Sequence, residues 1–231
     1  MAALLASATV AGCATDPSGQ NDPYDQTNRS IFAFDQMLDH AVARPVAVIY
    51  NHAVPELARD GVHNFLSNLE APVTLENDIL QGDPENASET LGRIAINSTI
   101  GVGGIVDVAA KMGIQRHNED FGLTLGVWGV GEGPYLVLPF AGPTNPRDLS
   151  GEAVDYFMDP LTYVKFRHSA LYMGIRSGVG ILDLRARNVE NLDAIERTSV
   201  DLYATTRSLY RQHRNSEIHN GAPDLENLPT L

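Results

Sequence analysis

Apolar residues in the first third of the chain recur every three or four positions, the spacing of one face of an α-helix. Such a stripe predicts amphipathic helices that bury one side and leave the other polar. No stretch reaches the ~18 continuous apolar residues of a membrane-spanning helix. We therefore expect a mainly α-helical fold in which any membrane contact is made by amphipathic helices. The stripe consists of Ile31, Phe34, Leu38, Val42, Val46 and Ile49, followed by Leu57, Val62, Phe65 and Leu69.

Prolines divide this pattern into segments. Asn21 or Asp22 before Pro23 predicts a helix N-cap with proline in the first turn. Pro45 lies within the stripe and predicts a kink, because proline lacks the amide hydrogen that a helix interior needs. We expect Pro55 to begin a second helix and Pro72 a third, shorter one that ends at residues 82–84. A fourth helix is expected over residues 85–100, with Gly101 after its last turn.

The second half of the chain predicts one extended segment and three more helices. Residues 135–140 are short, apolar and bounded by Pro and Gly, which fits a strand or an extended buried segment. Asn145 before Pro146 predicts a helix that runs to about residue 157. The remaining helices are expected over residues 169–187 and about 192–218. The last of them carries Val200, Tyr203 and Tyr210 on one side.

Charge argues against several classes of partner. The chain has 16 Lys and Arg against 29 Asp and Glu, a formal net charge of −13. Phosphate backbones are bound mainly by Lys and Arg, so nucleic acid is not an expected partner. The same acidity argues against attachment to an anionic membrane by charge alone.

The single cysteine, Cys13, follows a small, apolar and uncharged N-terminal stretch. Val10-Ala11-Gly12-Cys13 resembles the lipobox of bacterial lipoproteins, in which the cysteine receives diacylglycerol and becomes the first residue after cleavage. We therefore expect a lipoprotein signal peptide over residues 1–12 and a lipidated Cys13 with a flexible tether over 13–22. The basic start of a signal peptide is missing, so we expect either a start a few codons upstream or a trimmed chain. The alternative is a disordered N-terminus with an incidental thiol.

The residue after Cys13 is Ala14 rather than Asp, which by the usual sorting pattern indicates the outer membrane. Two or more acyl chains are needed for stable anchoring, and a mature lipoprotein carries three. The folded domain is expected over residues 23–219, and residues 220–231 as a loose C-terminal tail.

Residues 116–120, Arg-His-Asn-Glu-Asp, are the one stretch that suggests catalysis or metal binding. Their spacing does not match a His-Glu-x-x-His helix, and no second ligand cluster accompanies them. We favour a polar cap that opens the following helix. The sequence thus predicts no enzyme activity, no metal and no cofactor.

Three longer stretches carry a resemblance to a known family. They are NDPYDQTNRSIFAFDQMLD at 21–39 with RPVAVIY at 44–50, NFLSNLEAPVTLENDILQGDP at 64–84, and RHNEDFGLTLGVWGVGEGPYLVLPFAGPTNPRDLSG at 116–151. In this order they resemble the MlaA (VacJ) family of bacterial lipoproteins, over about residues 22–217. The resemblance implies a single-domain ring of amphipathic helices, with a glycine-rich central segment, in the inner leaflet of the outer membrane.

The resemblance also implies a function. Members of the family remove mislocalised phospholipid from the outer leaflet through an amphipathic channel, associate with trimeric porins and pass the lipid to a soluble periplasmic carrier. The protein would then lie on the periplasmic side of the outer membrane and maintain lipid asymmetry. The alternative is a porin-associated structural lipoprotein without transport activity.

Two groups of site residues remain open between a functional and a structural role. Arg147, in the family-like Asn-Pro-Arg-Asp stretch, could contact a lipid phosphate or pair with a neighbouring acid. Glycines of the central segment could form a close-packed or mobile pore wall, or only cap helices and make turns. These glycines are Gly101, Gly103, Gly104, Gly126, Gly129, Gly131 and Gly133.

Overall fold

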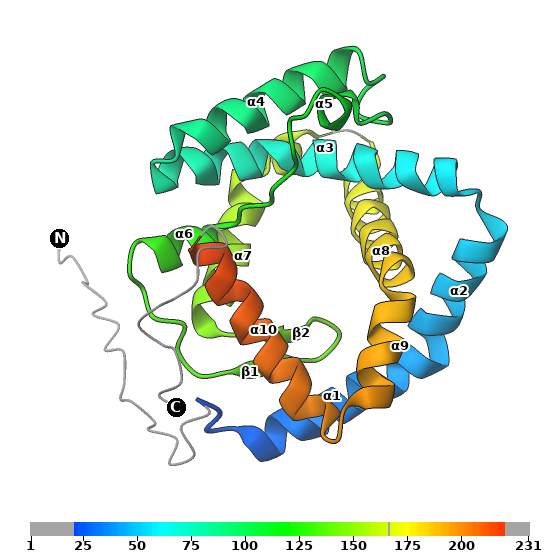
Figure 1. Ribbon diagram of the computed structural model, residues 1–231, viewed down its shortest axis with the longest axis vertical. Helices are drawn as coiled ribbons and strands as arrows, with labels where there is room; N and C mark the ends of the chain where they lie inside the picture. Colours follow the sequence, from blue (N-terminus) through cyan, green and yellow to red (C-terminus); the bar gives the residue numbers. More distant parts are fainter. Residues whose placement is uncertain (1–20, 166, 220–231) are drawn as a thin grey trace.

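The computed structural model describes residues 21–165 and 167–219, and Figure 1 shows them as a ring of helices. The ring begins with α1 (Asp25–Leu38), a π-helical turn η1 (Asp39–Ala43), α2 (Arg44–Ala53) and α3 (Glu56–Gln81). Outside α3 lie α4 (Pro84–Thr99) and α5 (Val108–Lys111). The mainly α-helical, single-domain ring expected from the sequence is thus confirmed.

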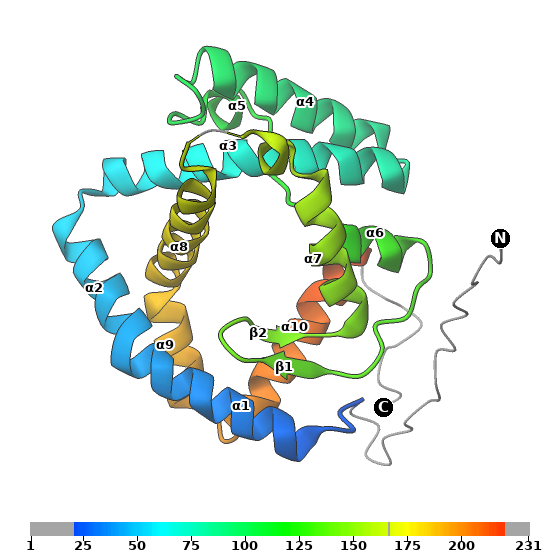
Figure 2. The same cartoon turned by 180° about the vertical axis from the view of Figure 1, so that it is seen from behind.

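The other side of the ring consists of α6 (Phe121–Val127), strands β1 (Leu136–Leu138) and β2 (Gly142–Thr144), and α7 (Pro146–Met158). A 3₁₀ turn η2 (Pro160–Tyr163) leads to α8 (Ser169–Arg187), α9 (Val189–Thr198) and α10 (Leu202–Ile218). The contacts close a circuit, since α1 touches β1, β2 touches α10, α10 touches α6, and α6 and α7 touch α3. Inside this circuit α8 packs on α2 and α3. Figure 2 shows the same arrangement from behind.

The predicted N-cap at Asn21 or Asp22 is wrong, because α1 begins at Asp25. The carboxylate of Asp22 is used for tertiary contacts instead. It accepts hydrogen bonds from Asn28 at 2.8 Å, from Arg207 at 2.7 Å and from the Tyr203 hydroxyl at 2.5 Å. Asp22 thereby joins the start of the ring to α10.

The kink predicted at Pro45 is confirmed, and it takes the form of the π-helical turn η1. Proline at the start of α2 cannot donate a backbone hydrogen bond to the preceding turn, and a widened turn accommodates that loss. The bend steers α1 and α2 around the ring (Figure 1).

The separate helix predicted to start at Pro72 is wrong, because α3 is continuous from Glu56 to Gln81 with Pro72 in its interior. Proline removes one hydrogen bond of the helix, but α3 packs along its length against α4 and also touches α6, α7 and α8. Tertiary contacts therefore outweigh the local cost. The fourth predicted helix is confirmed as α4.

The single C-terminal helix predicted over 192–218 is also wrong, since it is divided into α9 and α10. Asp201 caps α10 by accepting a hydrogen bond from the backbone amide of Ala204 at 3.1 Å. Val200 lies in the break and is fully exposed, whereas Tyr203 is buried. The helices predicted to end near residue 157 and to span 169–187 are confirmed as α7 and α8.

The apolar segment 135–140 contains a strand, β1, which pairs antiparallel with β2 so that Leu136 faces Thr144. Tyr135 and Val137 of this segment pack against Phe32 of α1 and Tyr203 of α10, forming the hydrophobic core cluster. The core therefore lies in one corner of the ring, where the N- and C-terminal helices meet.

Candidate functional site

The central gap of the ring is bordered by α7 on one side and α8 on the other (Figures 1 and 2). α6 packs on the outer side of α7, so the face of α7 turned away from α6 is directed toward the gap. By helix periodicity Leu149, Ala153 and Tyr156 lie on the side of α7 opposite Gly151 and Asp155, which contact α6, and all three are exposed. Their exposure shows that these side chains are accessible on the surface of α7.

The outer side of α7 is closely packed and charged. Asp148 is buried and accepts hydrogen bonds from Arg147 at 2.9 Å, Arg214 at 2.9 Å and the Tyr210 hydroxyl at 2.5 Å. Burial alone would raise the pKa of the Asp148 carboxyl, but the hydrogen bonds from Arg214 and Tyr210 outweigh it and lower the pKa. A charged, fully partnered carboxylate thus joins α7 to α10.

Close backbone contact adds to this packing. A Cβ atom at Gly151 would lie 2.2 Å from the backbone nitrogen of Gly122, so only glycine allows α6 and α7 to approach this closely. Asp155, one turn further on, accepts a hydrogen bond from the Phe121 amide at 3.0 Å and another from the Asn77 side chain at 3.0 Å. This wall of the ring is built as a fixed unit.

The α8 wall is different. Four large apolar residues of α8 expose more than half of their surface, whereas its residues Arg176, Asp183 and Arg187 form ion pairs with other residues of the chain. The four residues and their exposed fractions are Leu171 (62%), Ile175 (55%), Ile181 (66%) and Leu184 (66%). α8 therefore presents an apolar surface where α7 presents a mixed one.

Ion pairs hold α8 and α9 against the bend between α1 and α2. Arg185 donates to both oxygens of Asp39 in the π-helical turn, at 2.7 and 2.9 Å. Arg44, at the start of α2, donates to both oxygens of Asp193 at 2.9 and 2.6 Å. Bidentate arginine–carboxylate pairs fix both distance and orientation.

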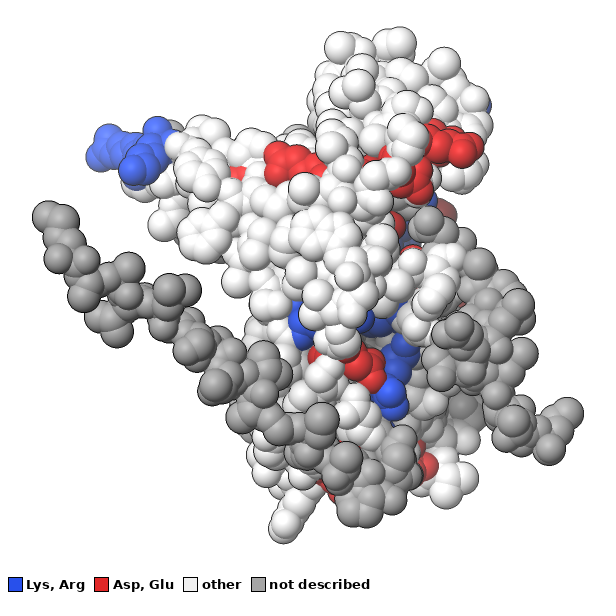
Figure 3. All heavy atoms as spheres, turned by 90° about the vertical axis from the view of Figure 1, so that its left-hand side faces the viewer, with Lys and Arg blue, Asp and Glu red and all other residues white. Residues whose placement is uncertain are grey.

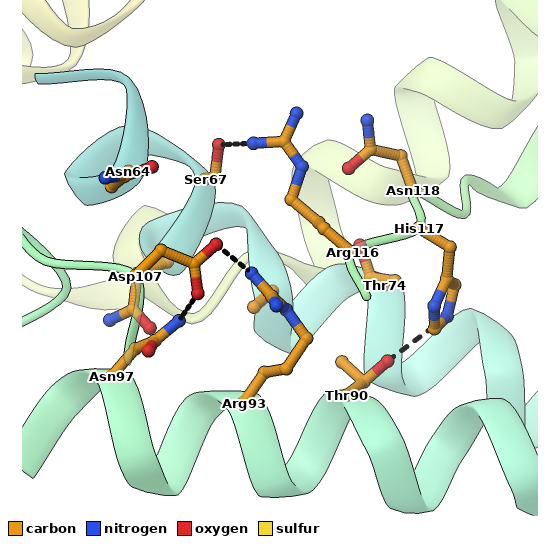
Figure 4. A pocket seen from close by; sticks show the side chains of 12 residues that line it. Asn64, Ser67, Thr74, Thr90, Arg93, Asn97, Asp107, Arg116, His117 and Asn118 are labelled. Atoms are coloured by element: carbon orange, nitrogen blue, oxygen red, sulfur yellow. Dashed lines mark hydrogen bonds and ion pairs between the residues drawn. The ribbon is translucent and has the colours of Figure 1, made fainter. Parts of the chain in front are cut away.

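A polar pocket lies between α3, α4 and the extended segment that follows α5 (Figure 4). His117 of that segment lies 3.0 Å from the buried carboxylate of Asp78, which also accepts a 2.7 Å hydrogen bond from Thr90. The hydrogen bond with Asp78 raises the pKa of His117. Arg93 of α4 donates to Asp107 at 2.7 Å and to the backbone of the same segment.

The interpretation of residues 116–120 as a polar cap is confirmed for Asp120, the last residue of the stretch. Asp120 caps α6 by accepting a 2.9 Å hydrogen bond from the Leu123 amide. Glu119 accepts from Gln81 of α3 at 2.7 Å, and His117 is paired as described. Among the residues that the structure describes, no group of three His, Cys, Asp or Glu side chains is arranged to hold a metal ion.

The central glycines lie in two places. Gly101, Gly103 and Gly104 form the turn between α4 and α5, on the side of α3 away from the gap (Figure 1). At Gly104, which has a φ of 93°, an added Cβ would lie 2.4 Å from the side chain of Asn68. These three positions fit the turn-and-packing alternative, and a pore-wall role for them stays a prediction.

The later glycines belong to α6 and the loop behind it. Gly126 packs against Ile218 of α10 and the Arg147 guanidinium, whereas Gly129, Gly131 and Gly133 lie in the loop between α6 and β1. A flexible role for this loop stays a prediction. The sequence did not single out Gly151, whose close approach depends on a partner helix elsewhere in the chain.

Arg147 is buried, with 7% of its surface exposed, and its guanidinium pairs with Asp148 at 2.9 Å. This pairing is the structural alternative left open by the sequence, and a headgroup contact would require the pair to open. Cys13, residues 14–20 of its tether and the tail over 220–231 lie outside the described residues. The flexible tether predicted to reach residue 22 is wrong at its end, because Asp22 is buried and hydrogen-bonded to α1 and α10.

Charged side chains on the side of the ring seen in Figure 3 form small groups separated by broad uncharged areas. A search of the described residues finds no helix both long and apolar enough to cross a membrane. Exposed apolar residues also continue along the outer helices, including Ile49 of α2, Leu57 of α3 and Leu91 of α4. Apolar area of this extent is typical of a surface that contacts lipid or another protein.

Fold and surface together define the class: a ring of helices with many exposed apolar side chains and, in the described part of the chain, no helix able to cross a membrane. The model of the MlaA lipoprotein family matches residues 20–217. The chain belongs to this family.

Several relatives are named intermembrane phospholipid transport system lipoprotein MlaA, among them the following two. The Escherichia coli protein is 38% identical, over 95% of this chain and 88% of its own length. The Haemophilus influenzae protein is 32% identical, over 99% of this chain and 94% of its own. A solved structure described as the structural basis for maintenance of bacterial outer membrane lipid asymmetry matches with a TM-score of 0.76. It is 35% identical, over 85% of this chain and 98% of that one. An uncharacterised protein of Rickettsia typhi is 37% identical over 85% of this chain.

Proposed function

We propose that the protein is an outer-membrane lipoprotein that removes mislocalised phospholipid from the outer leaflet through its ring and so maintains lipid asymmetry. Its relatives in Escherichia coli and Haemophilus influenzae are named as lipoproteins of intermembrane phospholipid transport. The matched structure concerns outer-membrane lipid asymmetry. These names support phospholipid as the cargo and the outer membrane as the location.

The observation that carries the proposal is the contrast between the two faces that border the gap. Exposed apolar residues of α8 can shield acyl tails, and each CH₂ group kept from water contributes about 0.8 kcal/mol. The exposed face of α7 carries Glu152 beside Tyr156 and keeps polar groups available to a hydrated headgroup. A path with both properties lowers the barrier to lipid extraction without any covalent step.

The apolar outer surface supports a position within one leaflet, where amphipathic helices lie with their apolar faces in the acyl boundary. We infer that lipidated Cys13 and the residues between it and the folded domain hold the ring on the periplasmic side of the outer membrane. Residues 1–12 would be the signal peptide removed on lipidation.

The route away from the ring needs partners. We infer that a periplasmic phospholipid carrier accepts the lipid and that a trimeric porin holds the ring in place. The net charge of −13 favours a carrier with a basic docking surface, because complementary charge speeds encounter. No catalytic residue is required in this scheme.

Complementation tests the proposal. Outer-leaflet phospholipid is measured in a Gram-negative strain that lacks its own MlaA, with and without this gene. Restored asymmetry, lost again in Cys13→Ser, is the expected result. If the leaflet stays rich in phospholipid although the protein reaches the outer membrane and its porin, the transport function is contradicted and the structural-lipoprotein alternative is favoured.

A further inference from the structure

Arg116 differs from most arginines in the described part of the chain, because no carboxylate of that part lies within ion-pair distance of it. Its Nη1 donates a hydrogen bond to the Ser67 hydroxyl. The same Nη1 also donates to Nε2 of His63, and these two nitrogens are 2.8 Å apart. Neither Nε nor Nη2 has a hydrogen-bond partner among the described residues. Two of the three guanidinium nitrogens are thus without a hydrogen-bond partner in the described part of a chain of net charge −13.

The guanidinium is held in place by a relay rather than by a counter-ion. Nδ1 of His63 lies 2.7 Å from the buried carboxylate of Asp183 on α8, so His63 donates there and accepts from Arg116 at its other nitrogen. Ser67, one turn along α3 from His63, provides the second acceptor. These contacts orient Arg116 without neutralising its charge, which is the arrangement of a preorganised anion site.

The other charges around the pocket cancel. Arg93 is matched by Asp107 at 2.7 Å, and His117 by Asp78 at 3.0 Å. The field of Glu70 on α3 acts on Arg116, but the two side chains form no ion pair. The charge of Arg116 is therefore the one left without a contacting opposite charge among the residues that line the pocket.

Asn118 adds a neutral donor. It lies two residues further along the same extended segment, and its side-chain amide makes no hydrogen bond to the described residues. Figure 4 shows Arg116 reaching across the pocket toward Ser67, with Asn118 on the same side of the segment. A planar guanidinium fork and a nearby amide match the oxygens of a phosphate group.

We propose that Arg116, assisted by Asn118, is a phosphate-binding site, with the headgroup of a phospholipid as its first expected ligand. The identity of that ligand rests on the proposed transport function; the anion site itself does not. The segment over residues 113–120 crosses α3 between α5 and α6 (Figure 1), and His63 connects it to α8. A phosphate bound there would lie near the edge of the ring, where α3 meets the apolar α8.

Binding to the purified full-length protein in detergent tests the site. The probes are dihexanoylphosphatidylglycerol below its micellar concentration, dihexanoylglycerol, which lacks phosphate, and inorganic phosphate, each followed by calorimetry. Arg116→Gln should weaken binding of the phospholipid at least about tenfold, the value of a hydrogen bond to a charged group. The phospholipid affinity of Arg116→Lys should lie between those of wild type and Arg116→Gln, because an ammonium group keeps the charge but cannot make two parallel hydrogen bonds to a phosphate.

Arg197→Gln is the matched control, since Arg197 is exposed on α9 and forms no ion pair in the described part of the chain. It should change the phospholipid Kd less than twofold. Asn118→Asp is the second variant and places a negative charge at the pocket without removing a contact. If Arg116→Gln fails to fold, Asn118→Asp decides, with weaker binding expected there as well.

Inorganic phosphate that binds as tightly as the lipid, with the same loss in Arg116→Gln, would support the site and assign it to free phosphate. Unchanged binding of both probes in Arg116→Gln and Asn118→Asp would overturn it. Failed complementation together with Arg116-dependent binding would contradict transport alone. Successful complementation with binding that ignores Arg116 would contradict only the site.

Discussion

The two helices that border the central gap, α7 and α8, differ in what lies behind them. α7 is backed by α6 and α10, with a buried, fully partnered Asp148 and a glycine contact that no other residue allows. α8 rests on α2 and α3 with Ala186 buried and with several ion pairs, and added Cβ atoms at Gly174, Gly178 and Gly180 would meet nothing within 4 Å. The comparison indicates that α7 is closely packed against its neighbours, whereas α8 is held more loosely.

Breaking the fixed wall should have the largest effect. Asp148→Asn leaves the buried Arg147 guanidinium without its counter-ion and removes one of those of Arg214. Loss of one partner of a buried pair costs about 3–5 kcal/mol of unfolding free energy, measured by denaturant titration in detergent. The control is Asp25→Asn, whose pair with Arg29 is exposed and should contribute about 0–1 kcal/mol. Equal losses in the two variants would show that the α7 wall is not specially packed.

A pair of glycine substitutions compares the walls directly. Gly151→Ala forces α6 away from α7 and should destabilise the protein by about 1–3 kcal/mol, as overpacking does. Gly178→Ala in α8 meets no neighbour and should stabilise by about 0.5–1 kcal/mol, since alanine favours the helix. Thermal unfolding of both variants shows whether each substitution raises or lowers the stability of the protein. Destabilisation by Gly178→Ala would mean that α8 is packed as closely as α7.

The ion pairs of the α8 side should have a smaller and more local effect. Asp39→Asn removes the charge that Arg185 contacts in the π-helical turn. This pair is partly buried, so the expected loss of about 1–2 kcal/mol lies between those of exposed and fully buried pairs. Hydrogen exchange should accelerate in α8 and α9 while α7 stays protected. Acceleration spread evenly over both walls would contradict an independently held α8.

The smallest effect concerns pH. Asp78 raises the pKa of His117 above its ordinary value in the folded state. The stabilisation from their pair is therefore complete below the ordinary histidine pKa of about 6.5 and is lost as pH rises through the raised value. Wild type should exceed His117→Gln in unfolding free energy more at about pH 5.5 than at about pH 8.5. If the difference in unfolding free energy between wild type and His117→Gln grew with pH, the His117 pKa would be lowered in the folded state rather than raised.

Local signals predicted much of the fold. Asn145 before Pro146 predicted the start of α7, and Gly101 the end of α4, because caps and breakers act over a few neighbouring residues. The continuity of α3 through Pro72 was not predictable in this way. It depends on the packing of α4 and the ring helices against α3, which outweighs the hydrogen bond lost at proline.

The site depends even more on distant residues. Asp22 looked like a cap and instead pairs with Arg207, because the ring brings α10 next to the residues that precede α1. The sequence drew attention to residues 116–120, which include Arg116. The orientation of the Arg116 guanidinium, however, depends on His63 and Asp183, which lie on α3 and α8. Long motifs indicated the family, but pairing across the ring required the structure.

The central claim is that phospholipid passes along the face of α7 turned toward the gap. Ala153 is exposed on that face, and Ala95 is exposed on α4, outside the ring. Outer-leaflet phospholipid is measured in the complemented strain for Ala153→Arg and for Ala95→Arg, at equal amounts of anchored protein. The account predicts that Ala153→Arg raises it to the level of the deletion strain and that Ala95→Arg does not. Full asymmetry in both variants would contradict a route through the ring.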